Sequence, residues 1–335
     1  MTVNVLERLN QALFTAMDSD ERVYLLGEDI TDPYGGAFKV TRGLSTKYPE
    51  RVITTPISEA AIVGIANGLA LRGLRPVVEI MFGDFITLIA DQLVNHASKF
   101  RWMYNENVRV PIVVRTPMGG RRGYGPTHSQ SLEKIFLGVP GLNVVAPNTI
   151  GDPGQLLLEA ISDDNPVLFV EHKLLYSLPQ LTSGQGDLAE FEIQNSGKAY
   201  PNFCLSIPFH KPDLTIATYG YNFELVRKAA IDLLMEHEIF AEIILFSQLN
   251  FFDMEMLFKS LHTSRRLLTV EEGTYSLGWG AEMIARVVEE NDDLRNYRFH
   301  RVTARDLPIA NSAPLENAIL PSVQDIVRSA ISLVS

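Results

Sequence analysis

Short apolar runs alternate with helix-like segments along most of the chain, and this alternation constrains the fold more than any other feature. The runs Val23–Gly27, Pro76–Phe82 and Pro111–Arg115 carry few polar residues, and segments with helical periodicity separate them. Strands that are apolar on both faces are typical of parallel sheets covered by helices on both sides. We therefore expect an α/β fold.

A loss of periodicity divides the chain in two. From about Leu178 to His210 the residues Gly, Ser, Gln, Pro and Asn dominate, and the alternation resumes with the run Leu214–Gly220. A chain of 335 residues is also too long for one ordinary core. We expect two doubly wound domains, residues 1–190 and 206–335, joined by a linker at residues 191–205.

Composition excludes several classes of protein. The net charge is −11 and no basic stripe occurs, which argues against nucleic-acid binding. No run of 18 apolar residues occurs and the first residues lack a secretory pattern, so we expect no membrane span and a cytoplasmic location. The single cysteine, Cys204, fits a reducing compartment and has no neighbouring base, so we expect an unreactive thiol.

A lone carboxylate stands at the start of an apolar helix. Glu59 precedes the run from Ala60 to Leu71, in which Asn67 is the only polar residue, so we expect protein on all sides of this helix. In one interpretation Ser58 caps the helix and Glu59 complements its dipole, which stabilises it by roughly 0.3–1 kcal/mol. In the other, the acid is functional, because a desolvated charge must be hydrogen-bonded, paired or used.

A glycine-rich loop follows the strand expected at Pro111–Arg115. Residues 118–131 contain four glycines, two arginines and His128. Open parallel sheets bind ligands at the carboxyl ends of their strands, where glycines permit close approach and arginines attract anions. Histidine transfers protons near neutral pH. We interpret the segment as a ligand-binding loop, with His172 as the second histidine candidate.

The common nucleotide and metal motifs are absent. No G-x-G-x-x-G follows the first strand and no Walker lysine motif occurs, and we interpret Gly278-Trp279-Gly280 as a tight turn with a packed indole. No pair of histidines has the spacing of metal ligands, which argues against a zinc or non-haem iron site.

Many sequence blocks nevertheless occur together in one order. They include Leu25–Asp29, Gly35–Leu44, Thr55–Glu59, Asp91–Gln92, His128–Gln130, Pro140–Val145, Asp163–Pro166, Val270–Gly273 and Leu320–Val323. In these blocks the chain resembles the beta subunits of the thiamine-diphosphate-dependent decarboxylating component of 2-oxo acid dehydrogenase complexes. This transketolase-like family includes pyruvate, branched-chain 2-oxo acid and acetoin dehydrogenases. The resemblance covers nearly the whole chain and implies a pyrimidine-binding domain followed by a transketolase-type domain.

The resemblance implies a thiamine diphosphate site. Glu59 matches the acid that hydrogen-bonds the aminopyrimidine ring and favours the imino form, whose exocyclic nitrogen can deprotonate the thiazolium carbon. Phe85 matches the aromatic position against the pyrimidine, with Phe82 as a neighbour. Glu28 and Asp91 match acidic positions near the cofactor.

Two further sites follow from the resemblance alone. His128 matches the histidine that handles the substrate carboxylate or delivers the acyl group to lipoamide. A monovalent cation, usually potassium, is implied at five positions: Ile112, Ala160, Ile161, Asp163 and Asn165. The alternative is an ordinary helix end that is capped by solvent.

The family's diphosphate and magnesium motif, G-D-G followed by asparagine, is absent from this sequence. The resemblance therefore implies that an alpha subunit holds Mg²⁺ and the diphosphate in an α2β2 heterotetramer, and that this chain is inactive alone. The remaining partners implied are a 2-oxo acid and a lipoyl acyltransferase core.

Departures from the family leave alternatives open. The loop Arg121–Thr127 is not typical of the pyruvate or branched-chain forms, and its Gly-Pro-Thr-His is similar to transketolase and deoxyxylulose-phosphate synthase. One alternative is a subunit of a split transketolase-like carboligase in which Arg121 and Arg122 bind a sugar phosphate. Another is a non-catalytic scaffold that keeps only the subunit interface.

Overall fold

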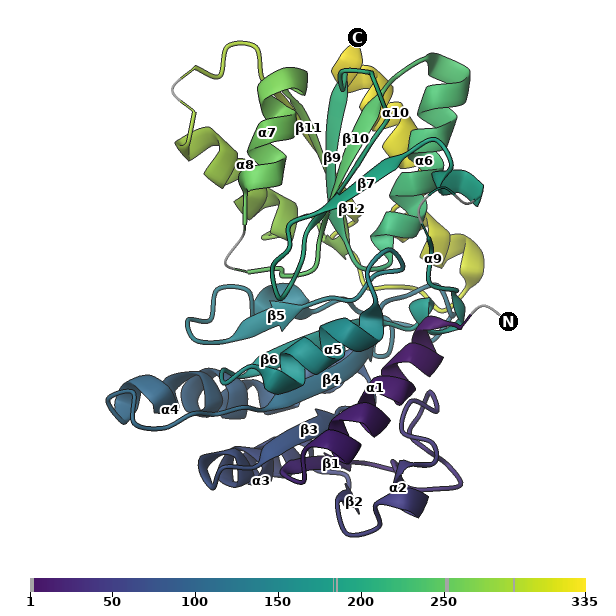
Figure 1. Ribbon diagram of the computed structural model, residues 1–335. Helices are drawn as coiled ribbons and strands as arrows, with labels where there is room; N and C mark the ends of the chain where they lie inside the picture. The colour runs from purple at the N-terminus through teal and green to yellow at the C-terminus, as the bar shows by residue number, and fades with distance from the viewer. Residues whose placement is uncertain (1–2, 183, 185, 251–252, 292) are drawn as a thin grey trace. The chain divides into compact units, whose positions relative to one another are not determined.

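The computed structural model describes residues 3–182, 184, 186–250, 253–291 and 293–335. The chain forms two compact units, each with its own six-stranded sheet (Figure 1). The first unit runs to Gly119 and continues from Gln130 to Gln180, and the second contains Gly120–Ser129 and everything from Leu181 onward. The glycine-rich loop thus belongs to the second unit.

The sheet of the first unit is entirely parallel, as predicted, with the order β2-β1-β3-β4-β6-β5. Its strands are β1 (Val23–Gly27), β2 (Val52–Thr54), β3 (Arg75–Glu79), β4 (Val113–Met118), β5 (Asn143–Val145) and β6 (Val167–His172). Strands β4 and β6 are buried along their whole length, which explains their unbroken apolar runs.

The described residues of this unit form the α-helices α1 (Val5–Ser19), α2 (Leu44–Lys47), α3 (Glu59–Leu71), α4 (Ser98–Met103) and α5 (Pro153–Ser162). Helix α1 begins with a capping box between Asn4 and Glu7, and α5 begins as predicted, with the Asp152 side chain accepting two backbone N–H bonds ahead of Pro153. Helices α1 and α5 pack against each other (Figure 1).

The helical segment predicted from about Phe85 to Trp102 is present, but it is not one regular α-helix. This segment is a 3-10 helix, η1 (Gly83–Ile89), then a π-helix, η2 (Gln92–Ala97), and then α4. The Asn67 side chain donates to the Gln92 carbonyl at 2.9 Å and competes with the regular helical ladder. The short helix predicted near residues 131–136 is likewise only a 3-10 turn, η3 (Glu133–Ile135).

The sheet of the second unit is mixed, with the order β12-β11-β9-β10-β8-β7. Its strands are β7 (Glu192–Asn195), β8 (Phe203–Ser206), β9 (Leu214–Tyr219), β10 (Ala241–Phe246), β11 (Arg266–Thr274) and β12 (Arg298–Ala304). Strands β9 to β12 are parallel, whereas β8 runs antiparallel to both β10 and β7. The expected linker at residues 191–205 is therefore wrong, because it contains β7 and most of β8.

Helices cover both faces of this second sheet. They are α6 (Asn222–His237), α7 (Glu255–Ser264), α8 (Trp279–Glu289) and α10 (Val323–Val334). The same unit contains α9 (Ala313–Ile319) and the 3-10 turn η5 (Gly186–Leu188), and the first unit contains the 3-10 turn η4 (Leu175–Ser177). Helices α7 and α8 lie on one face, and α6 and α10 lie together on the other (Figure 1). Within the described part of the chain, no helix is long and apolar enough to cross a bilayer.

Candidate functional site

Polar side chains gather at the carboxyl edge of the first sheet. Glu28 directly follows β1, Glu79 ends β3, and His172 ends β6 in register with Met118 of β4. Gly119 has φ +90°, and a Cβ there would lie 2.1 Å from Nε2 of His172. The backbone therefore approaches this ring more closely than a side chain would allow. Ligands of open parallel sheets bind at this edge.

Glu59 and Glu28 form the acidic centre of this edge, and each is 7% exposed. Burial raises the pKa of Glu28, and the nearby charges of Glu59 and Asp29 raise it further, whereas the Ser58 backbone N–H opposes the rise. Glu28 Oε1 is buried without a hydrogen-bond partner among the described residues. Two crowded carboxyl groups and an unsatisfied oxygen can accept and relay protons of a bound ring.

The interpretation in which Ser58 caps the helix is wrong. Ser58 is the N-cap residue of α3, but its side chain makes no capping hydrogen bond. Glu59 is thus the first helical residue of an N-terminus without a side-chain cap. Of the capping and dipole effects that the local interpretation assigned to Ser58 and Glu59, only the dipole effect is left.

The predicted aromatic residues pack together in the first unit. The Phe82 and Phe85 rings meet edge to face with centroids 6.1 Å apart, and the centroids of Phe38 and Phe82 are 5.9 Å apart. Both predicted rings are half-buried, and η1, which carries Phe85, packs against α3. These rings provide an apolar surface on the element next to Glu59, suited to a flat heterocycle.

A buried ion network supports the same edge. Arg115 Nε and Nη2 each lie 2.8 Å from a Glu171 oxygen, and Nη1 lies 3.1 Å from Glu79. The Tyr176 hydroxyl donates to Glu171 at 2.5 Å. Burial raises the pKa of Glu79, while the pKa of Arg115 rises because the two carboxylates outweigh the effect of burial. The network joins side chains of β3, β4 and β6.

This chain alone leaves part of α3 uncovered, so the prediction that protein surrounds the helix on all sides stays a prediction. One face of the helix is exposed, and it carries Ala61, Gly64, Ile65 and Gly68 and no polar residue. Ile65 is 55% exposed, and nearby Ile57 and Leu88 are 82% and 54% exposed. An apolar face of this kind is typical of a subunit interface.

The loop with His128 belongs to the second unit. Thr127 Oγ1 lies 3.0 Å from His128 Nδ1, and the His128 backbone N–H donates to the Gly125 carbonyl at 3.3 Å. The Arg121 guanidinium donates to Glu272 at 3.2 Å and to the Pro321 carbonyl at 2.7 Å. Arg121 is thus engaged within the protein, which disfavours its predicted alternative role in binding a sugar phosphate.

The packed indole predicted for Gly278-Trp279-Gly280 is confirmed, whereas the tight turn is wrong, because Gly278 is the N-cap of α8 and the next two residues begin the helix. The Glu271 carboxylate accepts the Trp279 and Gly280 backbone N–H groups, both at 2.8 Å. The Trp279 side chain is 1% exposed and packs edge to face on Tyr219 and Phe246. A carboxylate of the protein therefore occupies the helix N-terminus where a phosphate would bind.

The oxygens of the predicted cation site are engaged by protein donors. Arg75 Nη1 donates to the carbonyls of Ile161 and Asp163 at 2.9 and 3.0 Å, and Arg101 Nη1 donates to Asn165 Oδ1 at 2.9 Å. The Ile112 carbonyl accepts the Val167 N–H. Ala160 is buried within α5. These oxygens thus accept hydrogen bonds from residues outside the set, and a potassium ion at the five positions stays a prediction.

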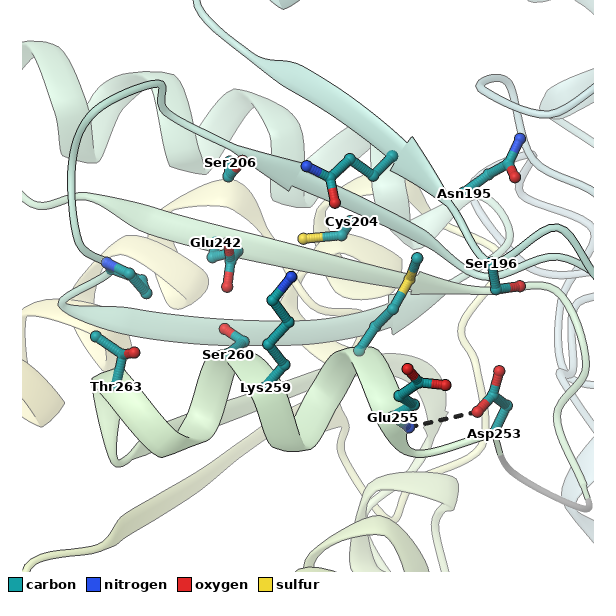
Figure 2. A pocket seen from close by; sticks show the side chains of 13 residues that line it. Asn195, Ser196, Cys204, Ser206, Glu242, Asp253, Glu255, Lys259, Ser260 and Thr263 are labelled. Atoms are coloured by element: carbon teal, nitrogen blue, oxygen red, sulfur yellow. Dashed lines mark hydrogen bonds between the residues drawn. The ribbon is translucent and has the colours of Figure 1, made fainter.

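Cys204 lies in a separate polar cavity of about 410 Å³ between β8, β10 and α7. Burial raises the pKa of its thiol to about 12, with Glu242 adding to the effect. Figure 2 shows Lys259 reaching from α7 toward Cys204 and Glu242. The thiol stays protonated near neutral pH, which agrees with the predicted lack of reactivity.

The sequence carried a signal for residues that the motif search missed. Glu79, Arg115 and Glu171 are charged residues within otherwise apolar runs, and the structure joins them in one network. A charged residue within an apolar run is a detectable pattern. The acids Glu272 and Glu316, which bind the glycine-rich loop, had no comparable signal, because three of the hydrogen bonds that they accept come from backbone N–H groups.

Residues 2–179 match the protein family described as "Transketolase, pyrimidine binding domain", and residues 207–326 match "Transketolase, C-terminal domain". The curated relatives include "Pyruvate dehydrogenase E1 component subunit beta-2, mitochondrial" of Oryza sativa subsp. japonica, 38% identical over 98% of this chain and 85% of its own length. "Pyruvate dehydrogenase E1 component subunit beta" of Rickettsia bellii (strain RML369-C) is 34% identical over 98% of both chains. The mitochondrial beta subunit of Saccharomyces cerevisiae (strain ATCC 204508 / S288c) is 34% identical over all of this chain and 89% of its own.

Solved structures share the fold at low identity. A chain titled "Split gene transketolase, inactive beta4 tetramer" matches with a TM-score of 0.74 and 17% identity over 100% of this chain and 99% of its own. Transketolase from Leishmania mexicana matches with a TM-score of 0.69 and 17% identity over 99% of this chain and 46% of its own. At these identities the likeness shows the fold alone.

Proposed function

The chain belongs to the family of beta subunits of thiamine-diphosphate-dependent 2-oxo acid dehydrogenases, and from this membership we propose which reaction it serves and how its residues act. It is a component of a 2-oxo acid dehydrogenase. We assign pyruvate or a related small 2-oxo acid as the substrate, because the matched relatives bear the name pyruvate dehydrogenase.

The observation that carries the proposal is the buried pair of Glu59 and Glu28 at the carboxyl edge of the first sheet. Bound thiamine diphosphate supplies an electron sink for the decarboxylation of a 2-oxo acid. Glu59 would hold the pyrimidine by a hydrogen bond to its ring nitrogen and would supply the carboxyl group for proton transfer there. Glu28, with its raised pKa and unsatisfied Oε1, holds a proton beside Glu59.

Phe82 and Phe85 pack against the pyrimidine and exclude water from its face. The Asp91 side chain is 59% exposed and accepts a hydrogen bond from Asn95, so the geometry favours Glu28 over Asp91 for the proton path. His128 handles the substrate carboxylate or assists delivery of the acyl group to lipoamide.

The exposed apolar face of α3 supports a partner subunit. Charged or polar residues cover the exposed face of an ordinary surface helix, whereas Ile65, Gly64 and Gly68 leave this one apolar. We assign the face to an alpha subunit that also holds the diphosphate and Mg²⁺, in an α2β2 heterotetramer that serves a lipoyl acyltransferase core. A cytoplasmic location remains a proposal, since the plant and yeast relatives are named as mitochondrial.

The alternative of a split transketolase-like carboligase receives less support. Its motivating feature was the arginine pair of the loop, and Arg121 is held by Glu272 and Pro321. A non-catalytic scaffold is also disfavoured, because such a chain has no need of buried acids at the ligand-binding edge of the sheet.

The test is reconstitution of this chain with its alpha subunit, thiamine diphosphate, Mg²⁺ and a lipoyl domain. We expect decarboxylation of pyruvate or a related 2-oxo acid, followed by acylation of the lipoyl domain. Transfer of the substrate carbon to an aldehyde, with no acylation of the lipoyl domain, would instead establish the carboligase.

A further inference from the structure

Two buried acids of the second unit hold the glycine-rich loop Gly120–Ser129. Glu316, on α9, accepts the Arg121 backbone N–H at 2.7 Å through Oε1 and the Gly123 backbone N–H at 3.2 Å through Oε2. Glu272, on β11, accepts the Gly120 backbone N–H at 2.8 Å and the Arg121 side chain at 3.2 Å. These residues are only 2% and 3% exposed, so both carboxylates are committed to the loop.

The loop has a backbone shape that depends on such support. Arg121 has φ +69°, an uncommon value for a residue with a side chain, and Gly123 and Gly125 have φ +66° and +78°. A Cβ at Gly120 would lie 2.7 Å from Leu320 and 3.2 Å from Glu316 Oε1. The first half of the loop is therefore seated closely on α9 and the residues that follow it.

The anchored half is connected to His128 by short-range bonds. Gly125, two residues beyond the Glu316 contact, accepts the His128 backbone N–H at 3.3 Å, and Thr127 contacts the His128 ring at 3.0 Å. Displacement of residues 121–123 thus moves the turn on which the imidazole is mounted. A shift of about 1 Å in a catalytic group can reduce a rate by about 10²-fold.

We propose that Glu316, assisted by Glu272, is a positioning residue that holds the loop so that His128 reaches its working orientation. The inference rests on the proposed function, because it assigns the effect to the step that His128 serves. Glu316 itself touches backbone N–H groups of the loop and acts through the histidine.

The test is a double-mutant cycle in the reconstituted complex, with lipoyl-domain acylation as the readout. Glu316→Gln keeps the side-chain volume but places an NH2 group where the carboxylate accepts one of the two backbone N–H groups. We expect kcat to fall about 10-fold or more, with KM within twofold of wild type. Adding Glu316→Gln to His128→Gln should lower kcat by less than twofold further, because both changes disable the same group. Independent, multiplicative losses would overturn the proposal.

The matched control is Glu282→Gln, which makes the same chemical change at a side chain that is 55% exposed on α8, and we expect no loss of rate. Glu272→Gln is the second variant if Glu316→Gln does not fold, and the same non-additivity with His128→Gln is expected.

Trypsin cleavage after Arg122, followed by mass spectrometry, gives a readout independent of activity. Cleavage should be faster in Glu316→Gln than in Glu282→Gln, and equal rates would contradict the anchoring role.

The two proposals fail in different ways. If the wild-type complex turns over no 2-oxo acid, the proposed function is wrong, and the trypsin rates still decide whether Glu316 holds the loop. If the wild type and His128→Gln behave as expected but Glu316→Gln retains full activity, only the positioning role is wrong.

Discussion

Arg115 and Glu171 form a two-point ion pair inside the first unit, with both nitrogen–oxygen distances at 2.8 Å. Both side chains are 1% exposed, and the third contact of the arginine reaches Glu79. The pair joins β4 to β6 at the edge where the candidate site lies. A guanidinium that holds two buried carboxylates has no replacement of similar geometry.

Substitution Arg115→Met is therefore expected to destabilise the protein strongly. It leaves Glu79 and Glu171 buried without their cation, and breaking a buried ion pair in this way costs about 3–5 kcal/mol. Urea-induced unfolding measures the change. The control Arg328→Met alters a side chain that is 73% exposed and should change the free energy of unfolding by no more than about 0.5 kcal/mol. Equal effects of the two variants would contradict the assigned network.

Glu28→Gln is expected to stabilise the chain at neutral pH. The folded-state pKa of Glu28 lies above its ordinary value, chiefly because the group is buried, so its ionisation disfavours the folded state. The stabilisation that protonated Glu28 gives the folded state is fully present below the unfolded pKa of about 4.3. It is lost as pH rises through the folded pKa. Melting temperatures of wild type and variant should converge at acidic pH and separate at pH 7, with the variant higher. The opposite order at pH 7 would show that Glu28 is stabilised as an anion.

Ile65→Asp is expected to block assembly with the alpha subunit. The change places a charge at the exposed apolar face of α3. Loss of a central interface residue typically weakens binding by about 2 kcal/mol or more, which is about 30-fold in affinity. Co-purification measures the loss. Met235→Asp, at a methionine that is 69% exposed on α6, is the control and should assemble normally. Normal assembly of Ile65→Asp would place the interface elsewhere.

The sequence predicted the parts of the fold that depend on local apolar patterns. Buried strands such as β4 and β6 were evident because both faces are apolar, and the start of α5 was evident from Asp152 and Pro153. Strand β7 was missed because its residues Glu192–Asn195 are mostly exposed at the edge of the sheet. The change from 3-10 to π-helical hydrogen bonding between η1 and η2 was missed because Asn67 contacts the Gln92 carbonyl from a different helix.

The candidate site was predictable to a similar degree. Glu59, Phe82 and Phe85 were identified from the sequence, and the structure brings the two rings together and places Glu59 beside Glu28. The partners of the loop were not predictable, because Glu316 lies 195 residues from Arg121 in sequence and binds its backbone. A backbone N–H has no sequence signature.

The most direct test of the account is the rate of 2-oxo acid decarboxylation by the reconstituted complex carrying Glu59→Gln. A positioned proton-transfer group contributes about 10²–10⁴-fold to a rate, so we predict a loss of that size while the complex still assembles and binds thiamine diphosphate. A decarboxylation rate within about threefold of wild type would contradict the role of Glu59, since a loss of 10²-fold or more is required.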